Sequence, residues 1–187
     1  MIPYAVLMAN LVSLDDVSQL IFYLTEWGVW ISFIAHIASL KAVKFDSWQK
    51  PAVILLEMAT CLDLIIVPIF WIGLWPMIYP SLVKGWPADF MTCLTMVTHH
   101  TVPAITTFSN LYFTDIKLLK KDWWICLIMG VLFIPANYAG FIVTGQSLYP
   151  GFDWTKPVLT AFLWFGVAVL QTVVYYAFAS WTHRKKQ

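Results

Sequence analysis

Long apolar runs alternate with short polar segments along this chain. A helix needs about 20 apolar residues to cross the hydrocarbon core of a bilayer. Five runs reach that length: Val17–Ala42, Pro51–Trp75, Ala88–Leu111, Trp123–Thr144 and Pro157–Trp181. A sixth run, Ile2–Leu14, is short enough to be a tilted span, an interfacial helix or a re-entrant piece. The pattern predicts an all-α, polytopic transmembrane helix bundle with five full spans plus a short N-terminal sixth.

The composition excludes several classes of protein. Of 187 residues, 60 % are apolar and 11 % are charged, and the mean hydropathy is +0.75. Soluble domains are about 45–50 % apolar and about 25 % charged, so neither a soluble fold nor a disordered chain fits. A net charge of +1 provides no basic field for a nucleic-acid partner. Because the loops are short, we expect one integral membrane domain over residues 1–187.

The basic residues are distributed unevenly between the segments that connect the spans. If every long run crosses once, only Lys84 and Lys156 lie on one side of the membrane. The other nine share the opposite side: Lys41, Lys44, Lys50, Lys117, Lys120, Lys121, Arg184, Lys185 and Lys186. Lys and Arg are enriched on the cytoplasmic side of membrane proteins. We therefore expect the C-terminus to face the cytosol, or the matrix of a mitochondrion.

The cysteines and one histidine give no reason to expect a metal or a cofactor. Cys61, Cys93 and Cys126 lie far apart in apolar runs, without a CxxC pair, so we expect buried free thiols. His36 lies roughly 12 Å from the depth of His99 along the bilayer normal, too far for both to bind one haem iron. We expect His36 near the basic interface.

Three polar residues from different runs fall at similar depths in the predicted bundle. Counted from the less basic side, Thr25, His99 and Asp63 lie roughly 12, 16 and 18 Å deep. Ionisable groups inside a membrane are candidates for function. A His can remove the proton of a Thr hydroxyl and so activate it as a nucleophile, and a carboxylate can orient the His. The other interpretation is that these residues join helices by hydrogen bonds.

Several short motifs occur in order along the chain. They are Phe22-Tyr23-Leu24-Thr25, Phe70-Trp71, Ile78-Tyr79-Pro80, His99-His100-Thr101-Val102, Val143-Thr144-Gly145 and Tyr149-Pro150. In their order and approximate spacing, from about residue 20 to residue 155, they resemble the androgen-induced-protein family of membrane proteins, with rolling-stone-like features.

The resemblance implies about six transmembrane helices and a hydrolase of fatty acid esters of hydroxy fatty acids. Members use an intramembrane Thr nucleophile and a His, which match Thr25 and His99 here. This chain departs from the family at His100, where members more often have Thr, and it is shorter than typical members. Asp63 is added to the catalytic set from its depth alone.

The resulting prediction is an intramembrane lipid ester hydrolase with Thr25 as nucleophile and His99 as base. We expect membrane lipids as partners, and substrate contacts from aromatic and polar residues near the two. These are Phe22, Trp27, Trp71, Trp75, Thr101 and Asn137. The alternative is a non-catalytic subunit that packs against neighbouring membrane subunits in a larger, possibly organellar, complex. Transport through helices interrupted by Pro68, Pro103 and Pro135 is a weaker third interpretation.

Overall fold

The structure is a computed structural model that describes residues 21–87, 89–114, 116–149 and 151–185. These residues form helices joined by short turns, and no strand occurs among them. The expected short run Ile2–Leu14 lies outside the described residues. The α-helices are α3 (Leu24–Ala42), α4 (Gln49–Pro68), α5 (Trp75–Lys84), α6 (Phe90–Phe113), α7 (Trp124–Thr144) and α8 (Pro157–Lys185).

Three helical segments are long and apolar enough to cross a membrane, which is consistent with an integral membrane protein. They are Asp46–Lys84, Lys120–Thr144 and Pro157–Thr182. The prediction of five full spans is therefore supported only in part. Helices form where the other two runs were placed, but α3 carries Glu26, His36 and Lys41, and α6 carries many Thr, His and Ser side chains. These polar residues lower the mean hydropathy of both helices.

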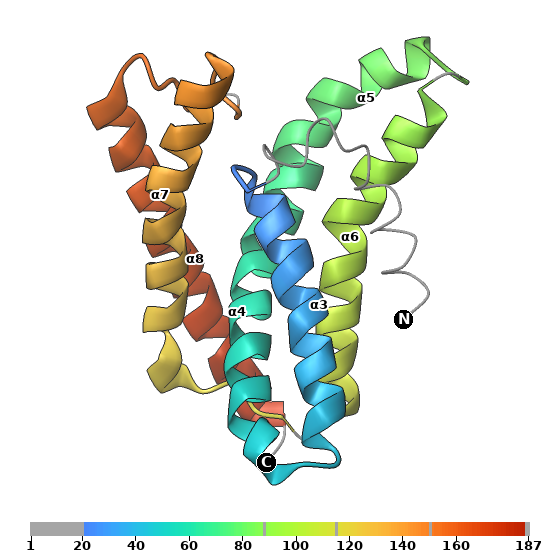
Figure 1. The fold of residues 1–187 in the computed structure, drawn as a ribbon, viewed down its shortest axis with the longest axis vertical. Helices are drawn as coiled ribbons and strands as arrows, with labels where there is room; N and C mark the ends of the chain where they lie inside the picture. Colours follow the sequence, from blue (N-terminus) through green and yellow to red (C-terminus); the bar gives the residue numbers. More distant parts are fainter. Residues whose placement is uncertain (1–20, 88, 115, 150, 186–187) are drawn as a thin grey trace.

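The helices are arranged as a three-helix group, formed by α3, α4 and α6, and a hairpin, formed by α7, α8 and the loop between them (Figure 1). Helices α3, α4 and α6 pack against one another, and α7 packs along α8. The hairpin contacts the group mainly through α4. Its apolar core joins Phe133 and Trp164 to Leu24 and Leu62, so burial of apolar surface holds the two parts together.

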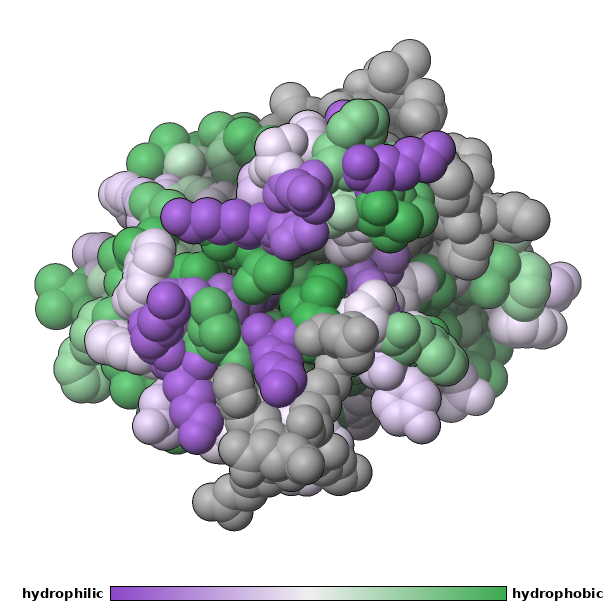
Figure 2. Space-filling model, turned by 90° about the horizontal axis from the view of Figure 1, so that it is seen from below, coloured by the Kyte–Doolittle hydropathy of each residue, from purple (hydrophilic) through white to green (hydrophobic). Residues whose placement is uncertain are grey.

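Six lysines lie at one end of the molecule: Lys41, Lys44, Lys50, Lys117, Lys120 and Lys121. The turn after α3 and the segment between α6 and α7 both lie at the lower end in Figure 1. Figure 2 views that end and shows hydrophilic side chains grouped around apolar ones. The helices therefore connect in the alternating manner that the charge pattern predicted.

The helix that begins at Gln49 changes its geometry after Pro68. Proline has no N–H to donate within a helix, and the next residues, Ile69–Leu74, form a π-helical segment, η2. A π-segment inserts an extra residue into the turn and often accompanies a bend. Helix α5 continues from η2 and leans toward the start of α6 (Figure 1). The segment places Phe70, which is 1 % exposed, against α6.

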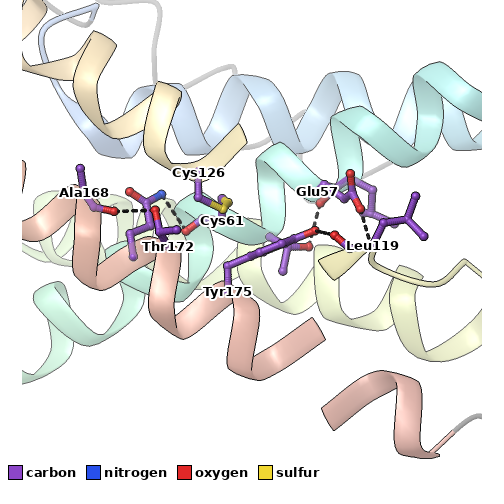
Figure 3. The surroundings of a disulfide bond; sticks show 10 residues. Glu57, Cys61, Leu119, Cys126, Ala168, Thr172 and Tyr175 are labelled. Carbon is purple, nitrogen blue, oxygen red and sulfur yellow. Dashed lines mark hydrogen bonds between the residues drawn. A yellow bond between two sulfur atoms is a disulfide. The ribbon is translucent and has the colours of Figure 1, made fainter. Parts of the chain in front are cut away.

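A disulfide between Cys61 and Cys126 links α4 to α7 (Figure 3). The expectation of three free thiols was wrong for this pair, because helices distant in sequence bring the two Cα atoms to 5.5 Å. Cys93 remains a half-buried thiol.

Polar contacts lie close to the disulfide on the same side of α4. The Glu57 carboxylate accepts the Leu119 N–H at 2.6 Å, and the Tyr175 hydroxyl donates to the Leu119 carbonyl at 3.3 Å (Figure 3). These bonds hold the segment before α7 against α4 and α8.

Candidate active site

Thr25 and His100 form a hydrogen-bonded pair across the interface between α3 and α6. The Thr25 hydroxyl lies 3.0 Å from His100 Nε2. On the other side of the ring, Nδ1 lies 2.6 Å from the carbonyl oxygen of Met96. A carbonyl only accepts, so Nδ1 carries the proton and Nε2 is left to accept the proton of the Thr25 hydroxyl. This is the tautomer that a general base for a hydroxyl nucleophile requires.

Packing fixes the His100 ring in this position. Phe70 stacks on it with ring centroids 3.7 Å apart and an angle of 9° between the planes. Because Phe70 comes from the π-helical segment, the local change of helix geometry contributes directly to the site. Both Thr25 and His100 remain half-buried, so the pair is not sealed inside solid packing.

His99, the predicted base, faces a different partner. Its Nδ1 lies 3.1 Å from the Glu26 carboxylate, and both residues are buried at 8 % and 7 % exposed. Its Nε2 is buried without a partner in the described part of the chain, so the predicted bond to Thr25 is wrong. Neighbouring residues of a helix point about 100° apart, and depth alone does not choose between them. The rotation of α6 turns His100 toward Thr25 and His99 toward Glu26.

Asp63 lies away from the Thr25–His100 pair, contrary to the prediction. Its carboxylate accepts a bond from Ser32 at 3.4 Å, and the Thr107 hydroxyl donates to Ser32 at 3.3 Å. Ser32 is two turns, about 10 Å, further along α3 than Thr25. Asp63 is therefore part of a separate buried cluster between α3, α4 and α6.

His36 also binds structural partners on this interface. Its two ring nitrogens lie 2.6 Å from the Ser32 carbonyl and 3.0 Å from the Thr106 carbonyl. Beside it, a groove of about 500 Å³ runs between α3 and α6 toward the lysine-rich end.

A small cavity of about 30 Å³ lies beside the Thr25–His100 pair. One wall comes from α3, α4, η2 and α6, and the opposite wall comes from the hairpin. The lining residues are Leu24, Thr25, Ile66, Ile69, Phe70, Leu74, His100, Tyr149, Phe152 and Trp164. A space of this size holds one or two water molecules, and it lies where the hairpin meets the three-helix group.

The aromatic residues predicted to contact substrate lie around this cavity rather than in its wall. Trp71 and Trp75 pack on Phe70, with ring centroids 5.2 and 5.4 Å away. Trp27 packs edge-on against Phe133 at 5.5 Å and donates its indole N–H to the Ile21 carbonyl. Phe22 lies close to Gly140 of α7. These side chains support the packing around the site.

The two polar residues of the predicted substrate set also lie elsewhere. Asn137 is fully buried, and its side-chain oxygen accepts the indole N–H groups of Trp154 and Trp164 at 2.8 and 3.1 Å. It therefore joins α7 to α8. The Thr101 hydroxyl is buried with no partner in the part of the chain that the structure describes.

Sequence reasoning missed several residues of the cavity wall, although the motifs contained them. Phe70 is the first residue of Phe70-Trp71, and Tyr149 is the first of Tyr149-Pro150. His100 adjoins His99 within one motif. The positions of Phe152 and Trp164 in the cavity wall could not be predicted, because nothing in their local sequence distinguishes them from other apolar core residues.

The chain is thus an all-helical protein whose longest apolar helices suit a membrane, with a hydroxyl–imidazole pair at one helix interface. No protein-family model, no curated protein and no solved structure matches this chain. Among the described residues, no group of three or more His, Cys, Asp or Glu side chains is placed to hold a metal ion.

Proposed function

We propose that this protein is an intramembrane lipid ester hydrolase in which Thr25 is the nucleophile and His100 is the base. The observation that carries the proposal is the 3.0 Å contact between the Thr25 hydroxyl and His100 Nε2, with Nδ1 bound to the Met96 carbonyl. Apolar walls around the pair suit a substrate that arrives from the bilayer. The resemblance to the androgen-induced-protein family supports esters of hydroxy fatty acids as the substrate class.

The proposed reaction has two stages. His100 Nε2 takes the proton of Thr25 while the Thr25 oxygen bonds to the ester carbonyl carbon. The tetrahedral intermediate collapses, the alkoxide leaves, and it receives the proton from His100. Water then attacks the acyl-Thr25 ester and gives a proton to His100. The second tetrahedral intermediate collapses, the bond between the acyl carbon and the Thr25 oxygen breaks, Thr25 takes the proton back from His100, and the fatty acid is released.

The helices around this site define the proposed placement in the membrane. Helices α3 and α6 cross with the three more apolar segments, because the polar side chains of each face the other and leave apolar side chains outward. Trp30, Ile34 and Ile105 are examples of exposed apolar residues on these two helices. The lysine-rich end faces the cytosol or the matrix, as expected for basic loops.

The test is hydrolysis of a palmitic acid ester of hydroxystearic acid by the purified chain in lipid nanodiscs. We expect Thr25→Ala and His100→Ala each to lower kcat by about 10²–10⁴, the range that a positioned acid–base group contributes. Thr25→Ser should retain measurable hydrolysis, because it keeps the hydroxyl. His99→Ala should cost less than His100→Ala, because the His99 ring contacts Glu26 instead.

Thr98→Ala is the matched control. Thr98 lies on α6, the helix of His100. Its hydroxyl donates to the Leu94 carbonyl of the same helix at 2.6 Å. Equal activity of Thr25→Ala and the wild type would overturn the proposal.

A non-catalytic membrane subunit is the second candidate, and the size of the cavity favours it. Ligand sites for extended molecules occupy about 300–1,000 Å³, whereas the cavity beside Thr25 has about 30 Å³. A substrate chain would have to part the hairpin from the three-helix group. Stoichiometric copurification with other membrane subunits, together with no effect of Thr25→Ala on any ester hydrolysis, would support this candidate.

A further inference from the structure

The Tyr149 side chain extends from the loop between α7 and α8 to the first turn of α3. Its hydroxyl oxygen accepts the backbone N–H of Leu24 at 2.8 Å, the residue directly before the proposed nucleophile. The ring packs between Phe133, Trp164 and Tyr23, with centroids 6.2, 5.4 and 6.2 Å away. Tyr149 also lines the cavity that contains Thr25 and His100. The Tyr149 side chain is thus packed against three aromatic rings, with its hydroxyl bound at the start of α3.

Among the residues that the structure describes, the Tyr149 hydroxyl donates to no acceptor, so its proton is available for a ligand. A phenol both donates and accepts, and the contact with Leu24 uses the oxygen only as an acceptor. Burial raises the pKa of Tyr149 above its usual value, so the hydroxyl keeps its proton at neutral pH. A protonated phenol at the edge of a small cavity is a hydrogen-bond donor for whatever occupies that cavity.

The backbone of Thr25 offers a second donor beside the same cavity. In the first turn of α3, the N–H groups of Glu26 and Trp27 donate to the Tyr23 carbonyl at 3.1 and 3.4 Å. The Leu24 N–H donates to Tyr149. Within the described residues, the Thr25 N–H has no such acceptor, as is usual for the first N–H groups of a helix. In acyl-transfer enzymes the nucleophile's own N–H commonly helps to bind the oxyanion.

We propose that the Tyr149 hydroxyl, together with the Thr25 N–H, stabilises the oxyanion that forms when Thr25 attacks a lipid ester. This inference rests on the proposed function. As the Thr25 oxygen bonds to the carbonyl carbon, the π electron pair moves onto the carbonyl oxygen and the Thr25 proton passes to His100 Nε2. The resulting oxyanion lies on the hairpin side of the cavity, where it accepts the bond from Tyr149. Collapse restores the carbonyl and expels the alkoxide.

The experiment compares Tyr149→Phe with the wild type in lipid nanodiscs, using the same palmitic acid ester of hydroxystearic acid. Phe keeps the ring against Phe133 and Trp164 and removes only the hydroxyl. Loss of one oxyanion donor costs about 10²–10³ in kcat, so we expect a fall of that size with little change in KM. Tyr138→Phe is the matched control, because Tyr138 stacks on Phe141 of its own helix and does not line the cavity.

Two inhibitors separate oxyanion binding from a structural role of Tyr149. A palmityl trifluoromethyl ketone accepts the Thr25 oxygen and forms an oxyanion, whereas the ether analogue of the substrate does not. In Tyr149→Phe the inhibition constant of the ketone should rise by the factor by which kcat/KM falls, while that of the ether stays unchanged. Both constants are independent of the fraction of protein that is folded.

The outcomes distinguish this inference from the function on which it rests. One outcome would contradict the role of Tyr149 alone: hydrolysis depends on Thr25 and His100, but Tyr149→Phe keeps the wild-type kcat and the wild-type inhibition constant of the ketone. Parallel weakening of ketone and ether overturns it as well, because a general distortion of the pocket would act on both. Absence of any Thr25-dependent hydrolysis overturns both proposals together.

Discussion

The interface between α3 and α6 and the interface between α7 and α8 are built from different contacts. Side-chain hydrogen bonds cross the first at Thr25–His100, Glu26–His99 and Ser39–Asn110. The second is held by a close approach of Gly130 to Ala168, by aromatic packing of Phe133 against Trp164 and by one side-chain hydrogen bond, from the Trp164 indole N–H to Asn137. Small residues and aromatic packing are sufficient to associate helices in a membrane. The α3–α6 interface thus depends on several polar pairs, among them Thr25–His100, whereas the α7–α8 interface depends mainly on packing.

The two regions also divide the candidate site between them. Helices α3 and α6 supply Thr25 and His100, and the hairpin supplies Tyr149, Phe152 and Trp164 across the cavity. A site at the meeting of two parts depends on how firmly they are joined. Changes to the contact between α7 and α8 away from the cavity should therefore affect stability first and activity second, whereas changes at Thr25 and His100 should do the reverse.

The largest expected effect on stability comes from the link between the regions. Replacing Cys61 and Cys126 by Ala removes a cross-link between residues 65 apart in sequence, which typically stabilises a protein by about 2–4 kcal/mol. We expect a matching fall in the free energy of unfolding, measured by thermal or denaturant unfolding in detergent. Cys93→Ala is the control, because Cys93 is not paired. Equal losses from the two variants would contradict a role of the disulfide in joining the hairpin to α4.

The next effect tests the close contact within the hairpin. A Cβ atom at Gly130 would overlap Ala168 Cβ and lie 2.9 Å from its Cα, so α7 and α8 must separate to admit it. Overpacking of this kind costs about 1–3 kcal/mol, and we expect Gly130→Ala to lower the unfolding temperature. Gly166→Ala makes the same change on α8, where no atom lies within 4 Å of the added Cβ. If both variants unfold alike, the hairpin interface differs from the one described.

The smallest expected effect on the free energy of unfolding comes from removing one hydrogen-bonding side chain between α3 and α6. Ser32 is fully buried and joins Asp63 to Thr107. Side-chain hydrogen bonds between membrane helices average about 0.6 kcal/mol, so Ser32→Ala should lower the free energy of unfolding by roughly that amount. Ser180→Ala, at a half-buried serine that donates to the Tyr176 carbonyl of its own helix, should have no measurable effect. A loss of several kcal/mol at Ser32 would show that the polar interface also carries the stability of the bundle.

Counting along the sequence predicted the positions of the helices well. The fourth expected span begins one residue before α7 and ends with it at Thr144, and the fifth begins with α8 at Pro157. The grouping of six lysines at one end also followed from the alternation of apolar runs. Only three of the five expected spans are supported by length and hydropathy, because run length was given more weight than the polar content of α3 and α6.

The candidate site was predicted only in part, and Thr25, His99 and His100 show the reason. Depth in a bundle follows from the rise per residue along a helix, so Thr25 and the two adjacent histidines could be placed in one layer. The side of the helix on which each residue lies relative to its neighbours depends on rotation and packing. Asp63 was assigned wrongly for the same cause: its depth was suitable, but α4 turns it toward Ser32.

The sequence by itself determined that this chain forms apolar helices with a basic end and a few polar residues among them, because each of these properties is local. The tertiary structure decided that His100 rather than His99 meets Thr25, that Cys61 pairs with Cys126, and that Tyr149 reaches the first turn of α3. These contacts join residues between 65 and 125 positions apart. Such contacts depend on how each helix is rotated about its axis and on which helices pack against it. Both are set by the burial of surface and the satisfaction of hydrogen bonds over the whole bundle, and no local sequence pattern contains that information.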